Sequence, residues 1–177
     1  MGRCALVDRP TPLEIFTTTH RITGQLHPGP QGLFAFVNRP TESSIEIEAA
    51  RVHALHQLPE EAESFASLWM VKAEIAVMAV GSRGEIGSTG GARGGYTKPF
   101  PHRVRILLTG YELRALVESA GKLDFSSLVL EGERLFVPAF EAELRAVLFP
   151  RVQLAAGGVL FNRRMVQAIS VVQRPVG

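Results

Sequence analysis

The sequence is poor in three features that often reveal a function: cysteine, aromatic residues and long apolar runs. Cys4 is the only cysteine among 177 residues, which excludes an intrachain disulfide. Aromatic residues make up 7%, too few for an interleaved series of exposed rings on a basic surface. No apolar run approaches the roughly 18 residues that a membrane-spanning helix needs. We therefore expect no membrane span and a reducing compartment, the cytoplasm.

The net charge of the whole chain is small, but the charged residues are unevenly divided along it. The net charge is +2, yet residues 1–80 carry 6 Lys and Arg against 9 Asp and Glu, whereas residues 102–177 carry 10 against 7. The two parts could attract each other or an oppositely charged neighbouring subunit, and the basic part could meet an anionic partner. The alternative interpretation is a solvated surface without functional meaning.

Glycine is abundant in one place, residues 81–101, which contain seven glycines. Such a segment loses too much conformational entropy to fold into regular structure, so it predicts a flexible linker. The predicted organisation is an N-terminal lead-in (1–17), a first β-rich repeat (18–80), the Gly-rich linker (81–101) and a second β-rich repeat (102–177).

Hydrophobic periodicity predicts mostly strands. Residues 21–26 alternate roughly, and residues 45–55 alternate clearly, with a change of phase at Ala49-Ala50 that predicts a β-bulge. Residues 33–37 form an apolar burst too short to distinguish a helical turn from a strand. Residues 111–120 place Leu113, Leu116 and Val117 at helical spacing, so we expect a helix there. Residues 68–78 predict a long apolar hairpin or bent strand.

Segments of the two parts resemble each other in the same order, which indicates an internal duplication. Three pairs of segments match: 45–52 with 128–135, 71–75 with 162–166, and 20–22 with 102–104. Three strands per unit leave edges unpaired, and two units can cover them by packing about a pseudo-two-fold axis. The predicted fold class is therefore mainly β with short helices, as two pseudo-equivalent β-rich halves forming a closed barrel or a two-sheet sandwich.

One stretch of the chain resembles a group of uncharacterised bacterial β-rich domains. The resemblance rests on the burst 33–40 ending in Asn38-Arg39-Pro40, the strand 45–52 and the stretch 71–75, and it extends in patches over 102–170. Those domains carry Asn before the Lys of the last stretch, where the first unit here has Val71 and the second keeps Asn162. The resemblance implies a duplicated β-rich architecture and no chemistry.

No catalytic or metal-binding motif is present. His53 and His56 fall on opposite faces of a predicted strand, which argues against a shared metal ion. Glu46 and Glu48 share a strand face and could act as paired carboxylates, but such a pair is typical of a solvated face. The chain has neither a Gly-any-Ser-any-Gly elbow nor a P-loop ending. We therefore predict no catalytic residue, no cofactor and no metal.

Basic residues supply the remaining candidates. Arg93-Gly94-Gly95-Tyr96 resembles a single RGG element, and Lys98 follows it. Arg163 and Arg164 could extend a basic patch in the second half, so the predicted anion or nucleic-acid contacts are Arg93, Tyr96, Lys98, Arg163 and Arg164. The aromatic residues Trp69, Phe34 and Phe36 are predicted to be core, with a ligand pocket as the alternative.

The sequence thus predicts a non-enzymatic binding or assembly protein that associates with a protein partner or with itself. One alternative is a small β-barrel that binds nucleic acid through the Gly-rich segment and the C-terminal arginines. The other is an enzyme or ligand-binding barrel whose site forms between the halves.

Overall fold

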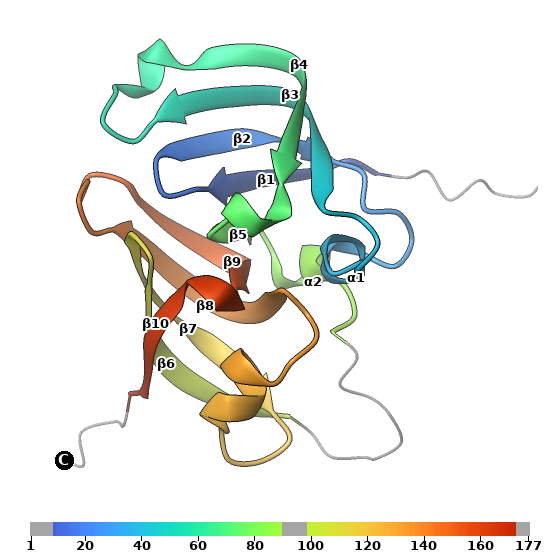
Figure 1. Cartoon of the computed structure of the whole chain (residues 1–177), viewed down its shortest axis with the longest axis vertical. Coiled ribbons are helices and arrows are strands. Elements are labelled where there is room, and N and C mark those ends of the chain that lie inside the picture. The colour runs from blue at the N-terminus through green and yellow to red at the C-terminus, as the bar shows by residue number, and fades with distance from the viewer. Residues whose placement is uncertain (1–8, 90–98, 173–177) are drawn as a thin grey trace, which may run out of the picture.

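The protein is built around ten antiparallel strands (Figure 1), seen in a computed structural model that describes residues 9–89 and 99–172. The first five strands are β1 (Thr11–Phe16), β2 (His20–Leu26), β3 (Ser44–Ala54), β4 (Glu63–Val71) and β5 (Val77–Val80). The last five are β6 (Phe100–Leu108), β7 (Tyr111–Ser119), β8 (Phe136–Ala146), β9 (Gln153–Asn162) and β10 (Val166–Val171). The expectation of a mainly β protein with short helices is confirmed.

Short helical elements connect the strands. They are α1 (Leu33–Val37), η1 (Pro59–Glu61), η2 (Lys72–Glu74), α2 (Arg83–Ile86), η3 (Ser126–Leu130) and η4 (Arg163–Met165). The apolar burst after β2 is therefore helical, and α1 buries Leu33, Phe34 and Val37. Both α1 and α2 lie on one side of the molecule, beside the middle of the sheet (Figure 1). In the part of the chain that the structure describes, no helix is long and apolar enough to cross a membrane.

The strands form one sheet in the order β10-β6-β7-β8-β9-β5-β1-β2-β3-β4. We call β1–β5 the first half and β6–β10 the second half. Each half has the same internal order, in which its fifth strand pairs with its first and the rest follow in sequence. The halves join through β9 and β5 (Figure 1). The sheet runs from β10 to β4 and is open, so the expected closed barrel or two-sheet sandwich is not confirmed.

The halves also correspond in local irregularities. The third strand of each half carries one non-glycine residue with positive φ, Ala49 in β3 and Glu141 in β8, both at 47°. At both places the pairing with the preceding strand shifts register, so the bulge expected at Ala49-Ala50 is present. A three-residue 3₁₀ turn links the fourth and fifth strands in each half, which is where the matched segments 71–75 and 162–166 lie.

The other two predicted matches, 45–52 with 128–135 and 20–22 with 102–104, do not correspond in the structure. The counterpart of Ile45–Val52 is 137–144, since Ile45 faces Met70 as Val137 faces Phe161. Residues 128–130 instead belong to η3. Residues 20–22 begin β2, whereas 102–104 lie in β6, the counterpart of β1. The two alignments failed because they rested on a short apolar pattern that many segments of this chain share.

The helix expected at 111–120 is also wrong, because Tyr111–Ser119 is β7. Leu113 and Val117 enter one core together with Ala115, whereas Leu116 packs against the other core. A strand with apolar residues on both faces therefore imitates the helical spacing. Pairing with β6 and β8 on both sides outweighs the local spacing.

Residues 68–78 form neither a hairpin nor one bent strand, because β4 and β5 do not pair and the 3₁₀ turn η2 separates them. The chain leaves the sheet edge at Val71, turns through η2 and returns as β5 at the opposite side of the same half, between β1 and β9.

The segments expected to be a lead-in and a linker contain ordered structure. Within the lead-in, Thr11–Phe16 is β1, which pairs with both β2 and β5. Within the Gly-rich segment, α2 buries Ile86 completely. Gly32 and Gly87 both have positive φ, and a Cβ on Gly32 would lie 2.8 Å from the Cα of Gly87. This close approach fixes the start of the Gly-rich segment against α1.

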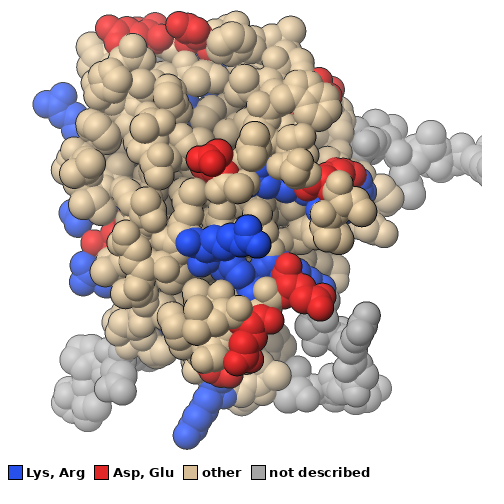
Figure 2. Space-filling model, viewed as in Figure 1, with Lys and Arg blue, Asp and Glu red and all other residues tan. Residues whose placement is uncertain are grey.

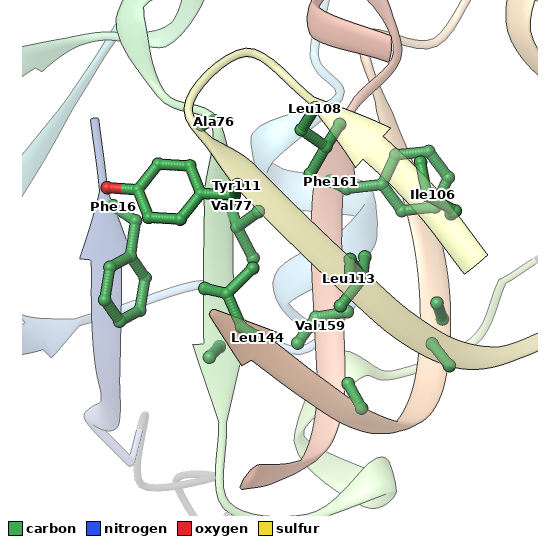
Figure 3. Packing of buried hydrophobic residues seen from close by; sticks show 14 of the residues in the cluster. Phe16, Ala76, Val77, Ile106, Leu108, Tyr111, Leu113, Leu144, Val159 and Phe161 are labelled. Atoms are coloured by element: carbon green, nitrogen blue, oxygen red, sulfur yellow. The ribbon is translucent and has the colours of Figure 1, made fainter. Parts of the chain in front are cut away.

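Two hydrophobic cores lie on opposite faces of the sheet. Strands β5 and β9 are central, so their alternate residues enter different cores: Val77 and Phe161 enter one, Met78 and Leu160 the other. This explains why β5 is buried at every position. In the first of these cores Phe16 meets Tyr111 edge to face, with ring centroids 5.8 Å apart (Figure 3).

Candidate functional site

Of the five predicted contact residues, only Arg163 and Arg164 can be placed. Arg93, Tyr96 and Lys98 lie outside the described residues. Arg163 and Arg164 form η4 between β9 and β10. Basic side chains gather near the middle of the face shown in Figure 2, with acidic groups above and below them. Arg164 is exposed, whereas Arg163 is partly buried, so the two neighbours are in different environments.

Arg163 has an unusual environment for a guanidinium. Its Nε and Nη1 are enclosed and have no hydrogen-bond partner among the described residues. Burial lowers the pKa of Arg163, and no carboxylate contributes to that shift. Gly132 lies directly against the guanidinium, because a Cβ at this position would overlap it. Buried donors without partners are destabilising, so this arrangement calls for an explanation.

Arg163 lines a cavity of about 300 Å³, which we call the junction cavity. Its walls come from both halves and from the chain between them: Phe34, Thr89, Pro99, residues 117–120, Ser127, Leu128, Arg134, Phe136, Val137, Pro138, Phe140 and Arg163. Phe34 of α1 is the one lining residue from the first half, so the cavity lies mainly in the second half, where that half meets α1.

Two further arginines shape the junction cavity. Arg134 lies over the ring of Phe34 at 4.8 Å and donates from Nη1 to the carbonyl of Thr89 at 3.2 Å. Arg83 lies over the ring of Phe140 at 4.0 Å and forms an ion pair with Glu118 at 2.8 Å. Because Glu118 is neutralised by Arg83, the cavity keeps a net positive character.

The residue of the first half that corresponds to Arg163 forms a hydrogen bond with the protein. Lys72 is the counterpart of Arg163, since each begins the 3₁₀ turn after the fourth strand. Lys72 is 4% exposed, and its Nζ donates to the carbonyl of Arg39 at 3.1 Å. In the second half the enclosed donors of Arg163 meet no such carbonyl among the described residues.

The second candidate region is formed by the two ends of the sheet. The β4 edge comprises Ser67–Val71, which pair with β3 on one side, and the β10 edge comprises 168–171, which pair with β6 on one side. The other side of each segment pairs with no described strand. Trp69 is 67% exposed, so its prediction as a core residue is wrong, whereas Phe34 is buried and Phe36 partly buried. Val71 and Val171 are also exposed.

These exposed residues occupy positions that are buried where the halves meet. At the junction Val77 faces Phe161, Met78 faces Leu160, and Val80 faces Gly158. The correspondence between halves places Trp69 at the position of Leu160, and Val171 at that of Val80. Leu160 and Val80 are 0% and 3% exposed. The free edge of β4 thus corresponds to the edge of β9 at the junction, and the free edge of β10 corresponds to that of β5.

The candidates for acid–base or metal chemistry are placed on the surface. Glu46 accepts a hydrogen bond from Ser67, and Glu48 lies 3.1 Å from His27, both on the exposed face of β3. Across the described residues, no three His, Cys, Asp or Glu side chains are grouped closely enough to hold a metal ion.

The sequence analysis did not single out Arg134 or Glu112, because no motif or spacing distinguishes either residue. Arg134 follows an acidic loop, and only the packing of α1 against β8 brings it to Phe34. Glu112 is a nearly buried carboxylate at 2.9 Å from Arg105 and 3.4 Å from Arg145. The hydrogen bond from Arg105 holds the pKa of Glu112 below its ordinary value, and the charges of Arg105, Arg145 and Arg114 add to this effect.

No family model, no curated protein and no solved structure matches this chain.

Proposed function

We propose that this protein is a non-enzymatic assembly protein whose copies join head to tail, the β4 edge of one copy pairing antiparallel with the β10 edge of the next. The observation that carries the proposal is the β9–β5 junction, in which a fourth strand already pairs with a fifth strand. We also propose that the halves are copies of one ancestral module, in agreement with the resemblance noted above.

The correspondence between halves defines the intermolecular register. The junction pair Leu160 and Met78 translates into Trp69 of one copy opposite Ile169 of the next. Gly158 and Val80 translate into Ser67 opposite Val171. This pairing would cover Trp69 and Val171, which are 67% and 46% exposed in the single chain. Strand addition forms new main-chain hydrogen bonds, and the burial of these apolar side chains adds to its free energy.

The two edges lack the features that normally prevent strand addition. Edge strands are commonly protected by lysine, proline or inward-pointing charge. Residues 64–71 contain none of these, and residues 166–171 contain no charged residue and no proline. The edges also belong to parts of opposite charge, because residues 1–80 carry a net −3 and residues 102–177 a net +3. Electrostatic attraction therefore favours unlike edges over like ones.

The association is expected to be weaker than the junction inside the molecule. Asn162, which bonds the junction strands together, has the exposed Val71 as its counterpart in β4. A head-to-tail contact is heterologous, so it continues until the chain of copies closes or is capped. We expect mostly single chains at about 1 µM and concentration-dependent growth towards about 100 µM, a range typical of small interfaces.

Sedimentation velocity over this concentration range tests the proposal. The variant Trp69→Lys places a charge at the centre of the expected ladder and should keep the protein monomeric. Phe65→Lys is the matched control, since Phe65 is an exposed aromatic residue on the same strand but outside the expected register. Equal association of wild type and Trp69→Lys, or a wild type that is monomeric throughout, would refute the proposal.

A mixing experiment distinguishes unlike edges from like edges. Trp69→Lys retains an intact β10 edge, and Val171→Lys retains an intact β4 edge. Each variant alone should be monomeric, whereas an equimolar mixture should form dimers and nothing larger. Dimers of Val171→Lys by itself would instead show that two β4 edges pair with each other.

A further inference from the structure

We infer that the junction cavity is a binding site for a small organic anion, a molecule with a phosphate or carboxylate group attached to an apolar body, and that Arg163 receives the anionic group. This inference concerns a different surface from the assembly edges and does not depend on them.

The charge of the ligand follows from the donors. Arg163 has two enclosed nitrogens without partners, which leaves Nη2 as the nitrogen that can face the cavity. A guanidinium with no carboxylate acting on it is strongly favoured as a partner for an anion. Glu118, the carboxylate in the cavity wall, is already paired with Arg83. The hydroxyl groups of Ser119 and Ser127 line the same cavity and can add neutral hydrogen bonds.

The apolar body of the ligand follows from the walls. Phe34, Phe136 and Phe140 line the cavity, together with Val117 and Leu128. A volume of about 300 Å³ is at the small end of ligand pockets and suits a molecule of about ten non-hydrogen atoms. A bare inorganic anion would leave these walls uncovered, so the site should prefer an anion that carries a ring or a branched chain.

Comparison of the halves gives an independent reason for a ligand. In the first half the buried cation Lys72 is satisfied by the carbonyl of Arg39, and its role is structural. In the second half the cation is larger, the loop carries Gly132 to accommodate it, and its enclosed donors are unused. The second half thus has a cation at the same position, but no described carbonyl accepts a hydrogen bond from its enclosed nitrogens.

Calorimetric titration with phenyl phosphate tests the inference, with inorganic phosphate and benzyl alcohol as probes of charge alone and apolar body alone. We expect a Kd of about 0.1–1 mM for phenyl phosphate and at least tenfold weaker binding of the other two. Arg163→Gln should weaken phenyl phosphate binding at least tenfold. Arg164→Gln is the matched control, because it removes the same charge from the neighbouring exposed residue and should change binding less than threefold.

Gly132→Ala provides a second variant that keeps Arg163. The new methyl group displaces the flexible guanidinium rather than backbone, so the fold should persist while binding weakens at least fivefold. Circular dichroism and thermal unfolding check that both variants are folded. Equal binding by wild type and Arg163→Gln, equal effects of Arg163→Gln and Arg164→Gln, or no binding of phenyl phosphate by the wild type would each overturn the inference.

Discussion

Asn162 is the residue whose replacement tests the junction most directly. Its side chain is completely buried, and Nδ2 donates to the carbonyl of Ile75 at 2.9 Å and to that of Ala73 at 3.3 Å. Its Oδ1 accepts from the backbone N–H of Arg164 at 3.0 Å. One amide therefore ties the end of β9 to the segment that leads into β5, and so joins the two halves.

The expected cost of Asn162→Ala can be worked out from these contacts. Asn162→Ala removes three hydrogen bonds, and each contributes about 1 kcal/mol to stability. We expect a loss of about 3 kcal/mol in the free energy of unfolding. With a urea dependence of about 2 kcal/mol per molar, the midpoint should fall by about 1.5 M.

Two further variants make the assay decisive. Asn162→Asp has nearly the same shape but turns the donor into an acceptor facing two carbonyls, so it should destabilise at least as much as Asn162→Ala. Val71→Ala changes the exposed counterpart in the first half and should stay within about 0.5 kcal/mol. An Asn162→Asp variant within about 0.5 kcal/mol of wild type would refute the reasoning, since shape alone would then explain the residue.

Three other outcomes are expected. Glu112→Gln should destabilise the protein by about 1–2 kcal/mol at pH 7; because the folded-state pKa of Glu112 is lowered, the difference should vanish as the pH falls through that value, which urea titrations at pH 3–7 measure. Burial raises the pKa of Tyr111 above its usual value of about 10, so absorbance of a Tyr96→Phe variant should show no phenolate until well above pH 10, while stability declines in the same range because the unfolded chain ionises first. Ile86→Ala should cost about 2–4 kcal/mol in thermal or urea unfolding, and no change would mean that α2 is a passive linker.

Much of the first half could be predicted from the sequence. The alternation of Ile45 and Ile47 with Glu46 and Glu48 predicted a half-buried strand, and the change of phase at Ala49 predicted a bulge, because both depend on which neighbouring residues are apolar. The match between 71–75 and 162–166 is equally local, since a 3₁₀ turn between two strands leaves a short signature. These features need no knowledge of distant partners.

Errors arose where distant pairing decided the structure. Tyr111–Ser119 has a spacing that fits a helix, and only its pairing with β6 and β8 makes it a strand. Trp69 looked like core because it lies in an apolar run, yet β4 is the last strand of the sheet and Trp69 lies on its exposed face. The candidate residue Arg163 was found as a basic residue, but its enclosed donors and its cavity depend on Gly132 and Phe34, which are far away in sequence.

The sequence by itself determined that this protein is mainly β and that its two parts carry opposite net charges. These properties follow from composition and from periodicities of a few residues. Only the tertiary structure decided that the fifth strand of each half returns beside the first, since strand order depends on contacts between residues far apart. That return pairs β9 with β5 and leaves β4 and β10 at the two ends of an open sheet.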